Sequence, residues 1–129
     1  GLLPVWPSLT MERPQVGEDV LSHDPQVTVR YRNDPLVHSR ASVRLYAELL
    51  QKFKELPSVL PQLKIPTLVL QAGADRVASP EATERLFPSI GSTEKKLIVY
   101  GGYYHEILHE VERERVFKDL LGWIQGREP

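Results

Sequence analysis

The sequence predicts an α/β fold with parallel strands for residues 66–125, and two observations support this prediction. Two short apolar runs, residues 67–70 and 97–100, are each followed closely by glycine, which is the pattern of strands buried on both faces. A helical segment follows each run after a short connection. This strand–helix–strand–helix order implies a parallel pair of strands with a right-handed crossover.

The first two helices are delimited by prolines and by residues that cap helix ends. Asp24 followed by Pro25 predicts a short helix, because Asp is a good N-cap and Pro suits the first helical position. That helix is expected to stop before Pro35, since a residue that precedes proline avoids helical angles. Ser39 predicts the start of a longer helix that ends at Pro57. Its apolar residues recur every four positions and are expected to be buried: Ala41, Leu45, Leu49 and Phe53.

The remaining helices follow the two predicted strands. Ser79 and Pro80 open a helix that Pro88 closes. The last helix is expected over residues 105–124, where apolar residues form a broad stripe. Four glutamates give this helix an acidic start that suits the helix dipole: Glu106, Glu110, Glu112 and Glu114.

Two parallel strands do not make a stable buried sheet by themselves, since each keeps an open edge and uncovered faces. No part of residues 1–65 has the pattern of a good strand, and prolines are concentrated in the first 35 residues. We therefore expect the opening segment to be irregular and the further strands of the sheet to lie outside this chain.

Composition and charge narrow the class of protein. The 129 residues suit one domain, and 41% hydrophobic with 26% charged residues are typical of a globular protein. The 16 Lys and Arg residues against 17 Asp and Glu residues argue against a nucleic-acid partner. No apolar run approaches the roughly 20 residues that a membrane-spanning helix needs. The absence of cysteine excludes disulfides, a thiolate nucleophile and cysteine-bound zinc.

An acidic side chain and an imidazole follow the two predicted strands. Asp75 lies in the loop after the first strand and His105 in the loop after the second. Functional groups of parallel α/β sheets gather beyond the carboxyl ends of the strands. We therefore expect an Asp75 oxygen within roughly 2.6–3.2 Å of a ring nitrogen of His105. Each residue taken alone also suits an ordinary loop position, but together they favour a carboxylate that orients a general base.

The segment that begins at His105 also reads His-Glu-x-x-His, the helical motif of zinc hydrolases. In that interpretation His105 and His109 bind zinc and Glu106 is the general base. The third ligand would have to be a carboxylate such as Glu112 or Asp119, because no histidine follows His109. This alternative is less favoured, since the first histidine follows a glycine-rich turn and would not lie inside a helix.

Several segments resemble a known family. Residues 65–77 (IPTLVLQAGADRV) and 104–110 (YHEILHE) closely resemble the C-terminal part of the monoacylglycerol lipase and lysophospholipase family. These serine aminopeptidase S33-like proteins are serine hydrolases with the α/β-hydrolase fold. Upstream, residues 22–25 and 31–37 look like the end of that family's cap and its return to the core. The resemblance covers residues 20–125.

The resemblance implies roles for individual residues. Asp75 would be the acid and His105 the base of a catalytic triad, with His109 as a secondary residue near the site. Tyr103 stands where the family more often has a small residue, and would narrow access to the histidine. The family's G-x-S-x-G nucleophile elbow precedes the acid and the base, and this sequence contains no such motif. The oxyanion-hole segment, which also precedes the elbow, is absent too.

We therefore expect the C-terminal portion of a serine carboxylic-ester hydrolase, with residues 1–35 as the end of a cap and residues 36–129 as part of the α/β-hydrolase core. Such a chain would be inactive alone and would need an N-terminal half or a partner chain. Its substrate would be a monoacylglycerol-like or lysophospholipid-like ester, with no cofactor, in the cytoplasm and in peripheral contact with membranes.

Two further alternatives stay open at this point. Within the same fold, the activity could be that of a peptidase or a non-lipid esterase, since fold does not fix substrate. Alternatively, the chain is a non-catalytic fragment or interaction module that pairs with another chain through its open sheet edge.

Overall fold

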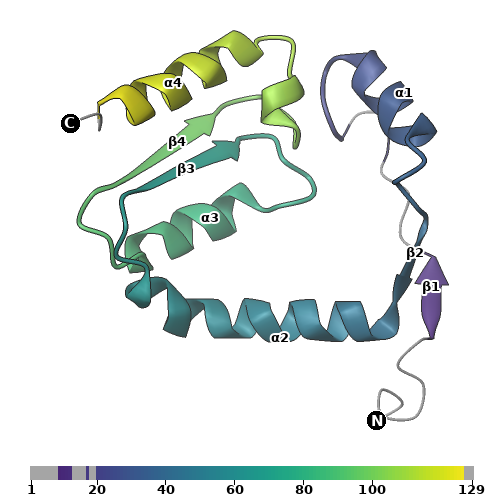
Figure 1. Cartoon of the computed structure of the whole chain (residues 1–129), viewed down its shortest axis with the longest axis horizontal. Coiled ribbons are helices and arrows are strands. Elements are labelled where there is room, and N and C mark those ends of the chain that lie inside the picture. Colours follow the sequence, from purple (N-terminus) through teal and green to yellow (C-terminus); the bar gives the residue numbers. More distant parts are fainter. Residues whose placement is uncertain (1–8, 13–16, 18–19, 127–129) are drawn as a thin grey trace.

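A computed structural model describes residues 9–12, 17 and 20–126 (Figure 1). Most of the proline-rich opening, including Pro4, Pro7 and Pro14, lies outside these residues. The strands are β1 (Thr10–Glu12), β2 (Arg40–Ser42), β3 (Thr67–Ala72) and β4 (Lys95–Tyr100). The α-helices are α1 (Pro25–Asn33), α2 (Val43–Val59), α3 (Pro80–Leu86) and α4 (Arg113–Gln125). Short 3₁₀ turns cover Leu60–Gln62, Phe87–Ser89 and Ile107–His109.

The predicted α/β architecture is confirmed around β3 and β4. These strands pair in parallel, with Thr67 opposite Lys95 and Ala72 opposite Tyr100. Figure 1 shows the pair between α3 and α4, so that a helix follows each strand and returns along the sheet. Both strands are slightly longer than the apolar runs that predicted them. Because the pairing is parallel, the carboxyl ends of both strands lie at the same end of the sheet.

A second, small sheet was not expected from the sequence. β1 and β2 pair antiparallel, with Met11 opposite Ala41. The side chain of Arg40 strengthens the pairing by donating to the hydroxyl of Thr10 at 2.7 Å and to its carbonyl at 3.2 Å. The prediction that residues 1–65 contain no strand is therefore wrong, because three-residue strands held by distant partners leave no local pattern.

The starts of α1 and α3 agree with the capping residues in the sequence. The Asp24 carboxylate accepts a hydrogen bond from the amide of Gln26 at 2.9 Å. The Ser79 hydroxyl accepts one from the amide of Ala82 at 3.1 Å. A proline occupies the first turn of both helices, where its missing N–H costs nothing.

The long helix α2 differs from its prediction at both ends. Its N-cap is Ser42, whose hydroxyl accepts from the amide of Leu45 at 3.1 Å, and not Ser39. Pairing of residues 40–42 with β1 delays the start of the helix. The helix also continues through Pro57 to Val59, so the proline does not end it.

The apolar stripe predicted to be buried on α2 is largely exposed. Leu45, Leu49 and Phe53 are 49%, 42% and 61% exposed, and only Ala41, which lies in β2, is buried. Figure 1 shows α2 running along one side of the structure, far from α4. Within the part of the chain that the structure describes, this face of α2 has no apolar surface over it.

The helix predicted over residues 105–124 begins later, at Arg113. The stretch before it forms a loop with one 3₁₀ turn, Ile107–His109. The amides of His105 and Glu106 donate to carbonyls of residues 20 and 21, at 3.2 and 2.8 Å. These distant partners replace helical hydrogen bonds, so the acidic pattern of residues 106–114 does not mark the start of a helix.

A small core lies directly beneath the carboxyl ends of β3 and β4. Ala72, Tyr100, Tyr103 and Val116 form a buried cluster that joins the sheet to α4. The hydroxyl of Tyr100 donates to the carboxylate of Asp119 at 3.0 Å. Burial, and then this hydrogen bond, raise the pKa of Tyr100 to about 12. The loops beyond the two strands therefore rest on a packed base.

Changing Val116 to alanine is expected to destabilise the protein by about 1.5–3 kcal/mol, because the removed methyl groups are fully buried. Val111, which is 64% exposed, provides the matched control. The same change there is expected to alter the free energy of unfolding by less than about 0.5 kcal/mol. Urea unfolding of both variants measures the difference, and equal losses would contradict the core described above.

Candidate active site

The loops that follow β3 and β4 are hydrogen-bonded to each other. The amide of Gly73 donates to the carbonyl of Tyr100 at 2.8 Å, and the amide of Ala74 to that of Tyr103 at 2.9 Å. A Cβ atom at position 73 would lie 2.9 Å from both Gly101 Cα and the Tyr100 carbonyl oxygen. Only glycine fits there, so the close approach of the two loops requires glycine at position 73.

This approach brings together the two residues singled out in the sequence. Nδ1 of His105 lies 2.9 Å from Oδ2 of Asp75, within the expected range. The other carboxylate oxygen, Oδ1, accepts hydrogen bonds from the amides of Val77 and Ala78 at 2.8 and 2.9 Å. The Asp75 side chain is 4% exposed, whereas that of His105 is 35% exposed. The carboxylate is thus fixed from both sides, and the imidazole reaches the surface.

The charge on Asp75 determines which nitrogen of His105 carries a proton. Burial alone would raise the pKa of Asp75, but hydrogen bonds from the Ala78 amide, His105 and the Val77 amide together hold it below its ordinary value. An ionised carboxylate only accepts hydrogen bonds, so Nδ1 of His105 is the donor. In the neutral ring, Nε2 then holds the free lone pair, as a general base requires.

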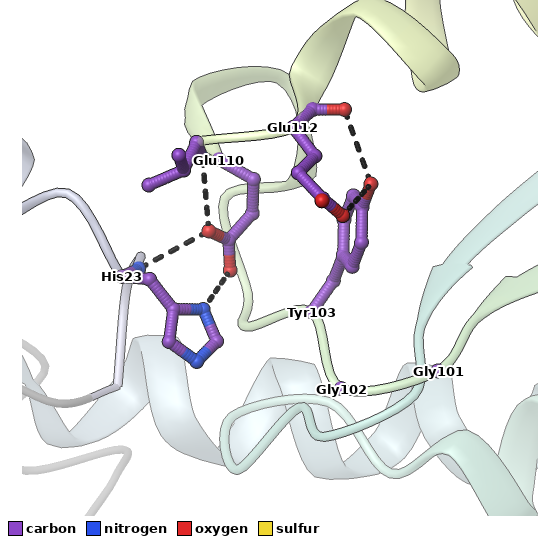
Figure 2. Close-up of a pocket in the computed structure, with 7 residues that line it drawn as sticks. His23, Gly101, Gly102, Tyr103, Glu110 and Glu112 are labelled. Atoms are coloured by element: carbon purple, nitrogen blue, oxygen red, sulfur yellow. Dashed lines mark hydrogen bonds and ion pairs between the residues drawn. The ribbon is translucent and has the colours of Figure 1, made fainter.

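A second carboxylate–histidine pair lies in the same region. Nδ1 of His23 is 2.9 Å from Oε1 of Glu110, whose side chain is only 3% exposed (Figure 2). Burial alone would raise the pKa of Glu110, but its hydrogen bonds together hold this pKa below its ordinary value. The strongest of these hydrogen bonds come from the Tyr104 amide and from the His23 side chain. The sequence did not predict this pair, because Glu110 has the pattern of a helix start and the partners are 87 residues apart.

An open hollow with a volume of about 390 Å³ lies beside this pair, and both His23 and Glu110 line it. Figure 2 shows the side chains that surround this hollow. Tyr103 forms part of its lining, and the ring also stacks on Tyr100 with 5.3 Å between centroids. Its hydroxyl donates to the backbone carbonyl of Glu112 at 3.1 Å. Tyr103 therefore belongs to the buried core cluster, and a narrowing of access to His105 by this residue stays a prediction from the sequence.

The geometry does not support the zinc interpretation of the His-Glu-x-x-His segment. His109 pairs with Glu106 at 3.0 Å, and these residues are not on an α-helix. The two candidate third ligands, Glu112 and Asp119, contact the hydroxyls of Tyr103 and Tyr100 instead. Among the described residues, no group of three or more metal-binding side chains gathers.

The fold and the paired loops define the class of protein. A carboxylate and a histidine after successive parallel strands are the arrangement of the C-terminal part of an α/β-hydrolase. The crystal structure of a monoacylglycerol lipase from Paleococcus ferrophilus superposes with a TM-score of 0.89 at 28% identity. The match covers 98% of this chain and 49% of that one.

The family model described as "Serine aminopeptidase, S33" matches residues 2–112, so the chain belongs to this family. "Phospholipase YtpA" of Bacillus subtilis is 35% identical over 121 residues, which are 92% of this chain and 46% of that protein. A "Monoacylglycerol lipase" of Mycolicibacterium smegmatis is 31% identical over 107 residues, which are 82% of this chain and 38% of that protein. The chain thus spans less than half the length of each of these relatives, and corresponds to their C-terminal part.

Proposed function

We propose that this chain is the acid–base half of a serine ester hydrolase, with Asp75 as the acid and His105 as the base of a catalytic triad. The observation that carries the proposal is the 2.9 Å contact between the two side chains at the ends of adjacent parallel strands. The serine nucleophile, within a G-x-S-x-G elbow, would be supplied by an N-terminal half or a partner chain.

The proposed reaction moves one proton through Nε2 of His105 in each of its two stages. As the serine oxygen bonds to the ester carbonyl carbon, Nε2 takes the hydroxyl proton, and Asp75 stabilises the resulting imidazolium. The imidazolium then gives this proton to the leaving alcohol oxygen as the C–O bond breaks. Water then attacks the acyl carbon while Nε2 takes a proton from that water. The imidazolium gives this second proton to the serine oxygen as the bond between serine and the acyl carbon breaks and the carboxylic acid leaves.

The described sheet has free edges that fit such an N-terminal half. β3 and β4 form a two-stranded sheet among the described residues, so each has one edge without a neighbouring strand. Further strands would pair along these edges. The exposed apolar face of α2 offers a second surface for the same half. In this proposal residues 36–129 belong to the hydrolase core and residues 1–35 to the end of a cap.

We infer a glycerolipid ester, such as a monoacylglycerol or lysophospholipid, as the substrate. The support is that relatives across most of this chain are named as a monoacylglycerol lipase and a phospholipase. None of the helices within the described residues is long and apolar enough to cross a membrane. A location in the cytoplasm, in peripheral contact with membranes, stays a prediction from the sequence.

The second candidate is a non-catalytic interaction module. The same free edges of β3 and β4 would then accept a strand from an unrelated chain.

The test compares this chain alone with the same chain joined to the N-terminal half of the B. subtilis relative, which we call the joined protein. Both are assayed on a short-chain monoacylglycerol and on a nitrophenyl ester. We expect no turnover above background from the chain alone, since His105 has no hydroxyl to activate, and clear turnover from the joined protein.

Two outcomes would contradict the proposal. Turnover by the chain alone that disappears after His105→Ala would show that this chain has its own nucleophile. A folded joined protein without turnover, beside an active B. subtilis enzyme, would favour the interaction module.

A further inference from the structure

Glu110 has a buried carboxylate that the proposed reaction does not use. Its Oε1 accepts a hydrogen bond from the amide of Tyr104 at 2.7 Å and contacts Nδ1 of His23. Its Oε2 accepts from the amides of His23 and Val111 at 3.1 and 3.2 Å, and from the Ser22 hydroxyl at 3.4 Å. A buried charge is tolerated only when it is hydrogen-bonded in this way. Glu110 therefore joins the segment before α1 to the loop after β4.

The groups that Glu110 holds lie next to the proposed triad residues in the chain. Tyr104 immediately precedes His105. Its ring stacks on the ring of His23, with 3.9 Å between centroids and 20° between planes. The guanidinium of Arg76, the residue after Asp75, lies 5.9 Å from the centre of the same tyrosine ring. The stack thus connects the neighbours of both triad residues.

The main chain at His105 depends on the same connection. His105 lies outside any helix or strand, and its amide donates to the carbonyl of Val20 at 3.2 Å. The amide of Glu106 donates to the carbonyl of Leu21 at 2.8 Å. The residues that supply these carbonyls directly precede the Ser22 and His23 groups held by Glu110. The carboxylate of Glu110 therefore holds both the residue before His105 and the segment whose carbonyls accept hydrogen bonds from His105 and Glu106.

We propose that Glu110 is a positioning residue that sets the orientation of His105 through the amide of Tyr104 and through His23. This rests on the proposed function, in which His105 is the base. The hydrogen bonds of Glu110 go to groups other than Asp75 and His105, so it acts on the position and direction of Nε2 through those neighbouring groups. A misplacement of about 1 Å in a catalytic group costs on the order of 10²-fold in rate.

The kinetic test uses Glu110→Gln in the joined protein. Glutamine puts an NH₂ group where one oxygen accepts backbone hydrogen bonds, so at least one of these bonds is lost. We expect kcat to fall by tens of fold, up to about 10²-fold, with KM within about twofold, because Glu110 does not contact the substrate. Glu112→Gln is the matched control: this carboxylate lines the same hollow but contacts the hydroxyl of Tyr103. Its kcat is expected to stay within about twofold.

A spectroscopic test does not depend on turnover. The Nδ1 proton shared by His105 and Asp75 is followed by NMR in the joined protein and assigned with His105→Ala. In Glu110→Gln we expect this signal to broaden and the Tyr104 amide to exchange with solvent at least about tenfold faster, while the amides of β3 and β4 stay protected. An inactive joined protein that shows these changes would refute the proposed function and leave the positioning role in place.

The positioning role is overturned if Glu110→Gln retains the kcat, the ring-proton signal and the Tyr104 protection of the parent. If Glu110→Gln loses the protection of β3 and β4 as well, His23→Ala replaces it as the test. That variant leaves the carboxylate in place but removes its ring partner and the stack on Tyr104. We expect a two- to fivefold fall in kcat, on the order of the loss of one such contact, with β3 and β4 still protected. An unchanged kcat and ring-proton signal would overturn the proposal.

Discussion

Changing His105 to alanine in the joined protein is expected to lower kcat for ester hydrolysis by about 10⁶-fold. Without the imidazole, no group takes the proton of the serine hydroxyl or gives a proton to the leaving alcohol. The residual rate comes from substrate binding and from the oxyanion donors. The rate is measured on a nitrophenyl ester under saturating substrate, where kcat reports the chemical steps.

Alanine substitutions at two other histidines test whether the loss of kcat is specific to His105. His38 is exposed, and its Nδ1 contacts the backbone carbonyl of Arg40 at 2.9 Å. His38→Ala is expected to keep kcat within about twofold. His109→Ala separates the triad from the zinc interpretation, because loss of a metal ligand would reduce kcat as severely as His105→Ala. A loss at position 109 that equals the loss at position 105 would refute the triad assignment.

Changing Asp75 to asparagine is expected to lower kcat by about 10⁴-fold with little change in stability. The Oδ1 atom of asparagine still accepts the amides of Val77 and Ala78, so the loop keeps its shape. The amide NH₂, however, now faces Nδ1 of His105 and donates to it. The ring is forced into the tautomer with its proton on Nε2, and that nitrogen no longer accepts a proton from serine.

The matched control for this change is Asp34→Asn. Asp34 Oδ1 accepts the amide of Leu36 at 2.8 Å, in a turn of the same kind as the one at Asp75. The kcat of the Asp34→Asn variant is expected to remain within about twofold of the parent. Urea unfolding is measured beside kcat for both variants. If Asp75→Asn keeps most of the activity, or if it unfolds at a much lower urea concentration than Asp34→Asn, the orienting role of Asp75 is wrong.

The features that the sequence predicted correctly depend on local signals. Pro25 and Pro80, with the Asp and Ser residues before them, mark the starts of α1 and α3. The apolar runs before residues 73 and 101 mark β3 and β4. The contact between Asp75 and His105 could be predicted from these strands alone, because parallel strands place their following loops at one edge of the sheet.

The features that the sequence did not predict depend on partners far away in the chain. The start of α2 moves to Ser42 because β2 pairs with β1. The segment before α4 stays a loop because Glu110 and the carbonyls near residue 20 take its hydrogen bonds. The stripe on α2 has the pattern of a buried face, but the described chain provides nothing that covers it. Periodicity indicates which face is apolar and does not indicate what packs on it.

The contact between His23 and Glu110 has a consequence for the order in which the molecule folds. It closes a loop of 87 residues, whereas pairs such as Thr67 and Lys95 in the sheet are much closer in sequence. The longer closure costs about 1 kcal/mol more in chain entropy. Contacts between distant residues also form more slowly than local ones. We therefore expect the strands and Asp75 to reach their places first, and the base of the proposed triad to become ordered only when the segment before α1 reaches the loop after β4.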